Sequence, residues 1–531
     1  MSTQHAAAKP DTVTDLLLAR ATDNNAGLLF EDRLWSWADY VAECARYAAM
    51  LDEQLDPARP RHIGVLCDNV PEVTFLLGAS ALAGTVLVGL NPNRRGAALA
   101  RDIIHTECQV VLTEHAHAPL LDGLDIGRAR VFDVADEQWQ QTPQAPDFQP
   151  VRARPEDLLM LIFTSGTGGE PKAVRITHDK IAGPGRMLAE RFELSGADTA
   201  YLSMPLFHSN AVMAGWAVGL ASGATLALRR RFSASRFLPD VRRFKATYAN
   251  YVGTPLSYVL ATAAQHDDAD NPLRVVYGNE AGERNAAAFA ERFDCRVIDA
   301  FGSTEGGVNF SRIPQAPPGS LGKPPEGVRV LDPETLEVCP PAEFDVDGRM
   351  TNGARCVGEL VNTAGTGSFA GYYRDPDADA ERVRDGMYFT GDLAYLDADG
   401  YCYFAGRRGD WLRVGGENLG TAPIERVLLR HPGVAEAVVY PVTEDGKVGD
   451  QVMAALVPHP DVTMRPAEFA EFLTAQPDLA PVQRPSYIRI ARELPRTSTY
   501  KVIKRQLSAQ GTRCEDPVWR WPQHATAPLP L

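Results

Sequence analysis

The sequence contains few cysteines and histidines, and neither type is grouped. Its 8 cysteines are scattered over 531 residues without a CxxC pair, and its 11 histidines form no HExxH motif or Cys/His cluster. This distribution argues against a structural zinc site and against a disulfide framework. In a chain of this length it predicts reduced, mostly buried thiols in a cytoplasmic protein.

An excess of positive charge is also missing. The 53 lysines and arginines are outnumbered by 68 aspartates and glutamates, so the formal net charge is -15. No basic tail or stripe offsets this charge, which argues against nucleic acid as a partner. The first residues, MSTQHAAAKPDTVTD, lack a basic segment followed by an apolar one, and we therefore expect no secretory signal.

Long apolar runs are scarce. The one candidate, residues 73–90, is just long enough to raise the question of a membrane span. Pro71 precedes this run, Gly84 interrupts it, and its end at residues 85–90 is rich in β-branched side chains. These features favour a helix, a glycine break and a buried strand over a membrane-spanning helix.

The remaining pattern predicts an α/β protein with more than one domain. The chain is too long for a single core, and its 45% hydrophobic and 23% charged residues are ordinary for a soluble globular protein. Up to about residue 300, short apolar segments alternate with helix-like segments, which predicts doubly wound sheets. Residues 319–361 and 387–405 are turn-rich and β-like. GRRGD at 406–410 indicates a joint before a smaller α/β unit.

A loop rich in glycine and hydroxyl groups is the first candidate site. The apolar residues 158–163 end in TSGTGGEPK at 164–172. Backbone N–H groups and hydroxyls at the end of a buried strand suit the oxygens of a phosphate. The GxxxxGKS/T pattern of phosphate-loop NTPases does not fit, because Pro171 stands where that pattern needs glycine. A plain surface turn is the structural alternative.

Four further polar motifs follow this loop along the chain. They are FGSTEGG at 301–307, YFTGDLAYLDADGYCYFAGR at 388–407, GDWLRVGGEN at 409–418 and PRTSTYKVIKRQL at 495–507. Together with the loop they resemble the acyl-adenylate-forming superfamily of acyl-CoA synthetases, luciferases and peptide-synthetase adenylation domains, over nearly the whole chain. The joint, GGEN and TSTYK resemble the branch of fatty-acid-transport proteins and very-long-chain acyl-CoA synthetases, in a fatty-acyl-CoA synthetase of actinobacterial type.

The resemblance implies a fold and a reaction. The fold is a large N-terminal domain of doubly wound sheets with a β-rich subdomain, residues 1–408, and a small mobile C-terminal α/β domain, residues 409–531, with a hinge at Gly409. The reaction is that of an ATP-dependent fatty-acid–CoA ligase. A carboxylate and ATP give acyl-AMP and pyrophosphate, and CoA then takes the acyl group, with Mg²⁺ as the metal. The acid is a fatty acid of medium to very long chain or a sterol side-chain acid.

The resemblance also assigns an ATP-binding set, residue by residue. In it Phe301 stacks on adenine, and Asp392 with Arg407 binds the ribose hydroxyls. Gly168 is a departure from the family, which commonly has a second threonine there. The full set is Thr164, Ser165, Gly166, Thr167, Gly168, Gly169, Lys172, Gly278, Asn279, Glu280, Asp299, Phe301, Gly302, Ser303, Asp392 and Arg407.

Catalytic, metal and CoA roles are implied in the same way. Lys501 serves adenylation, Thr304 bonds the α-phosphate or the substrate carboxylate, and Glu305 holds Mg²⁺, with Thr167 as a second metal ligand. His208 lies beside the acyl carboxylate, where the acyl tunnel has walls at 207–218 and 248–260. The CoA channel is lined by Gly415, Gly416 and Glu417.

Each role has a structural alternative. Thr304, in a Ser/Thr stretch followed by Glu305, is also suited to a helix N-terminal cap, and Asp392 to capping a turn. Arg407 is also suited to a surface ion pair, His208 to the core, and Lys501 to a solvated basic face. Two other functions stay open as well. One is a fatty-acyl-AMP ligase that loads a carrier protein, although the intact GGEN and the lack of an obvious insertion before the joint disfavour it. The other is a membrane-associated uptake or binding protein. A homodimer and a peripheral membrane contact are also left open.

Overall fold

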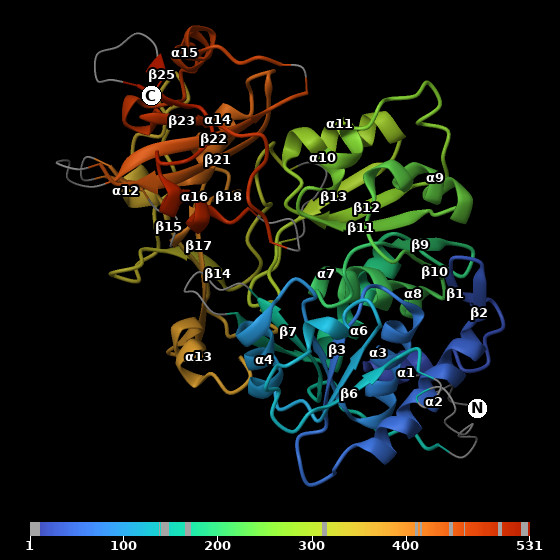
Figure 1. Ribbon diagram of the computed structural model, residues 1–531. Coiled ribbons are helices and arrows are strands. Elements are labelled where there is room, and N and C mark those ends of the chain that lie inside the picture. The colour runs from blue at the N-terminus through green and yellow to red at the C-terminus, as the bar shows by residue number, and fades with distance from the viewer. Residues whose placement is uncertain are drawn as a thin grey trace, which may run out of the picture. The chain divides into compact units, whose positions relative to one another are not determined.

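The computed structural model (Figure 1) describes residues 11–136, 139, 148–164, 171–310, 316–408, 412–414, 417–444, 450–460, 462–497, 502–521 and 529–530. By its internal contacts the chain divides into two compact units. Unit 1 comprises Met1–Gly306 and Ser368–Asp379, and unit 2 comprises Gly307–Gly367 and Ala380–Leu531.

The first sheet of unit 1 has six strands in the order β6-β5-β3-β4-β7-β8. All neighbours are parallel except β7 and β8, which form a hairpin. The strands β3, β4 and β5 are buried along their whole length, as expected for parallel strands covered on both faces. The strands are β3 (His62–Leu66), β4 (Val86–Gly89), β5 (Val110–Thr113), β6 (Arg130–Asp133), β7 (Leu158–Thr164) and β8 (Lys172–Thr177).

The long apolar run is a helix and a strand, as the sequence predicted. Helix α3 (Pro71–Ala83) has Pro71 in its first turn and ends at Gly84, whose φ is 63°. Strand β4 follows, and helix α4 (Gly96–His105) leads to the next strand. Among the described residues, no helix is both long enough and apolar enough to cross a membrane.

The second sheet of unit 1 has seven strands in the order β13-β12-β11-β9-β10-β1-β2. Its neighbours are parallel except β1 and β2, the hairpin near the N-terminus. The strands are β1 (Ala26–Phe30), β2 (Arg33–Ser36), β9 (Thr199–Leu202), β10 (Thr225–Leu228), β11 (Tyr248–Val252), β12 (Val275–Asn279) and β13 (Arg296–Ala300). Because these strands are parallel, the carboxyl ends of β9, β11, β12 and β13 all lie on the same side of the sheet (Figure 1).

Helices connect and cover these sheets. Helix α2 begins with a capping box in which Ser36 and Asp39 satisfy each other's backbone N–H groups. The other helical elements of unit 1 are α1 (Val13–Leu18), α2 (Trp37–Gln54), η1 (Ala118–Leu120), α6 (His178–Arg191), α7 (Ser209–Ala211), η2 (Val212–Trp216), α8 (Ala217–Ser222), α9 (Ala234–Phe244), α10 (Pro255–Leu260) and α11 (Glu283–Phe293).

A later segment of the chain returns to unit 1. Gly371 accepts a hydrogen bond from the Arg175 N–H at 3.0 Å, and the Tyr373 N–H donates to Ala173 at 2.8 Å. Tyr372 and Val174 form an antiparallel bridge between these bonds. Residues 371–373 therefore lie along the free edge of β8.

Unit 2 contains the predicted β-rich part and a smaller α/β part. In the first, the order is β14-β15-β17-β16, with β18 paired to β17. The elements are β14 (Val328–Leu331), α12 (Gly353–Cys356), β15 (Gly358–Asn362), α13 (Pro376–Arg382), β16 (Val383–Arg384), β17 (Met387–Leu396) and β18 (Cys402–Arg407); α13 spans the boundary between the units. The short pair β19 (Leu412–Val414) and β20 (Glu417–Leu419) follows.

The smaller part has a mixed sheet in the order β21-β22-β23-β24-β25. Its elements are α14 (Thr421–Leu428), β21 (Val434–Val442), β22 (Gln451–Pro458), α15 (Pro466–Thr474), η4 (Pro481–Gln483), β23 (Tyr487–Ile490), α16 (Lys504–Gln510), β24 (Val518–Arg520) and β25 (Leu529–Pro530). The α/β class with doubly wound sheets, a β-rich part and a small α/β part is thereby confirmed. The cysteines are all free and most are buried, which confirms the prediction for the thiols.

Candidate active site

The carboxylate of Glu305 is the centre of the first group of predicted site residues, which lies within unit 1. Glu305 follows β13 and is 8% exposed. Its Oε1 atom accepts hydrogen bonds from the Thr164 hydroxyl at 3.3 Å and from the Tyr372 hydroxyl at 3.1 Å. Thr164 is the last residue of β7. The predicted metal ligand therefore lies beside the strand end from which the phosphate loop starts.

The backbone around Glu305 is held independently of its carboxylate. The Lys180 ammonium on α6 is 5% exposed and donates to the Glu305 carbonyl oxygen at 2.7 Å. Burial lowers the pKa of Lys180 to about 8, against the opposing effect of the Glu305 charge. The Gly306 carbonyl accepts the N–H and the hydroxyl of Ser368 at 3.2 and 3.0 Å. Gly306 has a φ of 72°, and a Cβ there would lie 2.2 Å from that hydroxyl oxygen, so this turn requires glycine.

Thr304 and His208, both predicted to be catalytic, lie on adjoining elements. The Thr304 hydroxyl is 2.8 Å from the hydroxyl of Ser209, the first residue of α7 and the neighbour of His208 in the chain. His208 is the N-cap of this helix, and its ring packs on Phe207 with a centroid separation of 4.5 Å. The end of β13 is thus next to the start of the helix that carries one predicted wall of the acyl tunnel.

That helix continues through a π turn, η2. The Ala217 N–H donates to the carbonyl of Val212, five positions back. The Ala214 carbonyl accepts the hydroxyl of Tyr248 on β11, at 2.6 Å in the buried interior. The two stretches predicted as tunnel walls therefore pack on each other, and π turns are common at functional sites.

The residues predicted near adenine lie at the carboxyl end of β12. Gly278 lies so close to β11 that a Cβ atom at this position would be 2.1 Å from the Tyr251 carbonyl oxygen. The Asn279 side chain donates to the Ala300 carbonyl at 2.9 Å and so ties β12 to β13. Glu280 has a left-handed φ of 67°, which is uncommon outside glycine and often marks functional loops.

Asp299 on β13 holds the loop that follows β12. Its Oδ1 atom accepts the Tyr251 hydroxyl at 2.7 Å and the Ala281 N–H at 3.0 Å. Both bonds are structural, so the structure gives Asp299 a role in shaping the loop that follows β12.

The turn after β13 contains Phe301, Gly302 and Ser303. The Gly306 N–H donates to the carbonyl oxygen of Ser303 at 3.1 Å and to its hydroxyl at 3.4 Å. The segment is a turn, and no helix begins at it, in contrast to the helix N-terminal cap that the sequence left open as an alternative. The turn presents Thr304 and Glu305 at its centre.

The predicted ribose-binding pair comes together within unit 2. Asp392 on β17 and Arg407 on β18 are directly paired across the two strands, and the Arg407 Nε atom is 3.4 Å from Asp392 Oδ1. The Asp392 N–H donates to the Thr390 hydroxyl at 3.0 Å. The Asp392 side chain is 13% exposed and that of Arg407 is 41% exposed, so the pair is accessible to a ligand.

Several predicted site residues lie outside the described part of the chain. They are Ser165, Gly166, Thr167, Gly168, Gly169, Gly409, Gly415, Gly416 and Lys501. Glu417 is described only as the first residue of strand β20. Lys172, the first residue of β8, lies with its Nζ atom 5.4 Å from the centroid of the Tyr372 ring.

Sequence reasoning missed Tyr372, Lys180 and Ser209. Lys180 had a usable signal, because a lysine within the apolar positions of helix α6 requires a buried partner. Tyr372 had no such signal, since its contacts depend on a chain segment that returns from unit 2 to the edge of β8.

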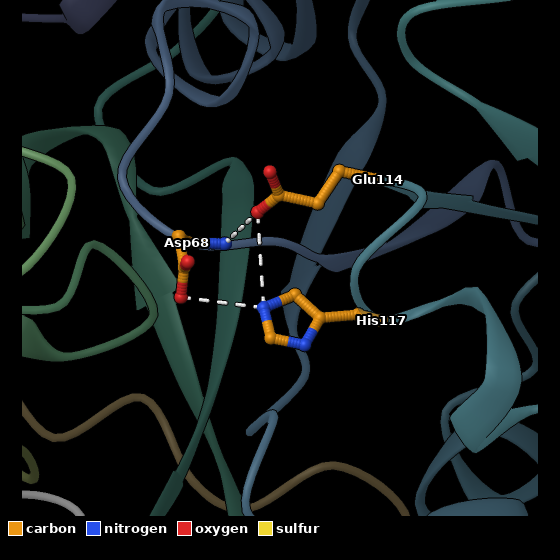
Figure 2. Close-up of side chains that lie close together, drawn as sticks. All are labelled: Asp68, Glu114 and His117. Carbon is orange, nitrogen blue, oxygen red and sulfur yellow. Dashed lines mark hydrogen bonds and ion pairs between the residues drawn. The ribbon is translucent and has the colours of Figure 1, made fainter.

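One other group within the described chain has metal-ligating donors close together, Asp68, Glu114 and His117 (Figure 2). The His117 Nε2 atom is 3.2 Å from Asp68 Oδ1 and 3.7 Å from Glu114 Oε1. Arg231 contacts both oxygens of Asp68, and Arg230 bonds Glu114. Two guanidinium groups thus neutralise two carboxylates. This closed ion-pair network links the ends of β3 and β5 to the end of β10 and does not require a cation.

Comparison with known proteins identifies the family of the chain. The family model of the AMP-binding enzyme matches residues 18–373, and that of the AMP-binding enzyme C-terminal domain matches residues 423–501. A protein of Mycobacterium tuberculosis named medium/long-chain-fatty-acid–CoA ligase FadD17 is 54% identical over 511 residues, covering 96% of this chain and 98% of that protein.

More distant proteins extend the comparison. The steroid-22-oyl-CoA synthetase of Rhodococcus jostii is 42% identical, covering 96% of this chain and 93% of that protein. The solved structure of ATP-bound MatB from Rhodopseudomonas palustris has a TM-score of 0.80 at 22% identity, covering 93% of this chain and 98% of that one, and so supports the fold alone. The chain belongs to the AMP-binding enzyme family, as its ordered motifs predicted.

Proposed function

We propose that this chain is an ATP-dependent fatty-acid–CoA ligase that forms acyl-AMP and pyrophosphate and then acyl-CoA and AMP. The observation that carries the proposal is the contact of Glu305 with Thr164, which joins the acidic motif to the start of the phosphate loop across 141 residues of sequence. The relative from Mycobacterium tuberculosis, similar over nearly its whole length, supports the same reaction.

The first half-reaction is a displacement at the α-phosphorus of ATP, which needs charge stabilisation more than a protein nucleophile. In our proposal, loop residues 164–169 hold the β- and γ-phosphates, Thr304 bonds the α-phosphate or the carboxylate, and Lys501 supplies positive charge. The oxygen donors of Glu305 and Thr164 are of the type that a hard cation takes, so the site fits Mg²⁺. Glu305 and Thr167 would hold this ion, which neutralises phosphate charge when bound.

The nucleoside is proposed to occupy the remaining positions. Phe301 and residues 278–280 are its adenine walls, and the Asp392–Arg407 pair is its ribose site. A carboxylate can accept hydrogen bonds from both ribose hydroxyls, and the adjacent guanidinium pairs with this carboxylate. His208, beside the Thr304–Ser209 contact, is proposed to adjoin the acyl carboxylate.

The second half-reaction is proposed to use a different arrangement of two domains, residues 1–408 and 409–531. Gly409 would be the hinge, because glycine accepts wide changes of φ and ψ. Rotation would withdraw Lys501 and bring Gly415, Gly416 and Glu417 to the pantetheine channel. A second domain is supported by the separate family match at residues 423–501.

The acid is proposed to have a medium to long acyl chain, with a sterol side-chain acid as the second candidate. The first choice follows the name of the relative at 54% identity, and the second follows that of the relative at 42%. Val212, where some long-chain relatives have a tryptophan gate, is buried in the π turn.

The free, mostly buried thiols support a cytoplasmic location.

The test is pyrophosphate release with a panel of fatty acids of increasing length and a sterol side-chain acid, with and without CoA. We expect sustained release only with both an acid and CoA, and acyl-CoA as the product. Transfer to a holo-carrier protein but not to CoA would instead identify a fatty-acyl-AMP ligase. ATP binding without turnover on any acid would identify an uptake or binding protein and overturn the proposal.

A further inference from the structure

Tyr372 is fixed in place by its backbone. It lies on the segment that returns to the edge of β8, where it bridges Val174, and its N–H donates to Asp379 Oδ1 at 2.7 Å. The side chain is buried, at 3% exposure, and its ring packs edge-on against Phe369 with a centroid separation of 5.2 Å. The position of the ring is therefore set by the fold and does not depend on a ligand.

The two polar features of this side chain point at two different charged groups. Its hydroxyl donates to Glu305 Oε1 at 3.1 Å, a contact in the buried interior. The face of its ring lies 5.4 Å from the Lys172 ammonium, within the range of a cation–π interaction. Lys172 begins the strand that leaves the phosphate loop. One rigid tyrosine thus contacts a negative and a positive group of the predicted triphosphate site.

We propose that Tyr372 is a positioning residue that holds Glu305 and Lys172 in a fixed relation before ATP and Mg²⁺ bind. A hydroxyl that donates to a ligating carboxylate orients its oxygens, as outer-shell partners of metal ligands do. The ring restrains the ammonium without adding a competing negative charge. Prearranged charges need no reorganisation when the nucleotide arrives. The inference rests on the proposed function, because it takes Glu305 as the ligand of the nucleotide's Mg²⁺.

The surrounding contacts allow the hydroxyl to be tested alone. Lys180 and Ser368 hold the backbone of residues 305 and 306, so the turn does not depend on Tyr372 for its shape. Tyr372→Phe keeps the ring and its contact with Lys172 and removes the hydroxyl that donates to Glu305. The chain also offers a matched control. Tyr373, the next residue, donates its hydroxyl to another carboxylate, Glu107, at 2.6 Å, away from the site.

The experiment compares the full-length wild type, Tyr372→Phe and Tyr373→Phe. ATP binding is measured by calorimetry over a range of Mg²⁺ concentrations, and pyrophosphate release over the same range. For Tyr372→Phe we expect the Kd for ATP with Mg²⁺, and the Mg²⁺ concentration for half-maximal rate, to rise about 10- to 100-fold. Transfer of a supplied acyl-adenylate to CoA is expected to stay at the wild-type rate.

Thermal unfolding of both variants separates positioning from general stability. If Tyr373→Phe changes the Mg²⁺ dependence as much as Tyr372→Phe does, or if neither changes it, the role of Tyr372 is refuted. Tyr372→Leu also removes the ring, and we expect it to weaken ATP binding more than Tyr372→Phe does. If both variants bind ATP equally well, the contact of the ring with Lys172 has no role in ATP binding. ATP binding does not require an acid substrate. Failure of every acid would therefore overturn the proposed function and leave the test of Tyr372 intact.

Discussion

His178 is a buried histidine whose surroundings favour the neutral form. It is the first residue of α6 and is 2% exposed, and its Nδ1 atom has no hydrogen-bond partner among the described residues. Burial lowers its pKa to about 4, although the nearby carboxylate of Asp157 acts in the opposite direction. The unfolded chain takes up this proton near the ordinary value of 6.5. Between these values the unfolded state binds more protons, so the folded state loses stability as pH falls.

We therefore expect His178→Gln to flatten the acid side of the stability profile. The pKa difference corresponds to about 3 kcal/mol, present above pH 6.5 and lost as the pH approaches 4. Melting temperatures measured from pH 7 to pH 4 should fall less steeply for the variant than for the wild type. His266→Gln, at an exposed position, serves as the control. Parallel profiles for all three proteins would contradict the assignment.

At the scale of elements, the helix from Ser209 to Ser222 differs from an ordinary α-helix. The sequence predicts a helix over residues 213–221, and the structure has α7, the π turn η2 and α8 in succession. The Ala214 carbonyl in the π turn accepts the Tyr248 hydroxyl on β11. A tertiary contact between a helix and a strand therefore accompanies the π turn, and local sequence preference does not reveal this contact.

Tyr248→Phe should destabilise this helix and disturb the acyl site. The variant removes a buried hydrogen bond between the helix and β11, which costs about 1 kcal/mol. We expect a lower melting temperature and a higher KM for the acid, with the KM for ATP unchanged, because the helix carries the proposed acyl wall. Tyr277→Phe on the paired strand β12 is the control, since this ring is only half-buried. A rise in the KM for ATP alone would argue against this role.

For the whole molecule, the central question is whether one chain uses two arrangements for its two half-reactions. Two lysines near the C-terminus, Lys501 and Lys504, are candidates for the charge that only adenylation needs. The structure gives Lys504 an ion pair with Glu425 at 2.8 Å and a hydrogen bond to Thr421 at 2.9 Å. These contacts hold Lys504 within unit 2 and favour Lys501 as the adenylation lysine.

Lys501→Ala should therefore separate the two half-reactions. We expect acyl-AMP formation to fall about 100- to 1,000-fold, as when a group that stabilises transition-state charge is removed, while thioester formation from supplied acyl-adenylate is retained. Lys504→Ala should keep adenylation and lower the melting temperature. Single-turnover assays of each half-reaction make the comparison. Equal loss of both halves in Lys501→Ala would refute its assignment to adenylation.

Much of the architecture could be predicted because it is encoded locally. Apolar runs and alternation gave the strands, Pro71 and Gly84 bounded α3, and the DADG turn at 397–400 joined β17 to β18. That hairpin also brings Asp392 to Arg407, since the two residues are close in sequence and directly paired. The motifs and their order were likewise sufficient to predict the family.

The sequence by itself determined the elements, their class and the residue types at the strand ends. Only the tertiary structure decided which of these residues meet. Glu305 contacts Thr164, Lys180 and Tyr372, which are 141, 125 and 67 positions away in the chain. Such contacts depend on the order of strands in a sheet and on a segment that returns from unit 2. Neither is specified by the periodicity of any single stretch, because periodicity sets which face of an element is buried and not which element covers it.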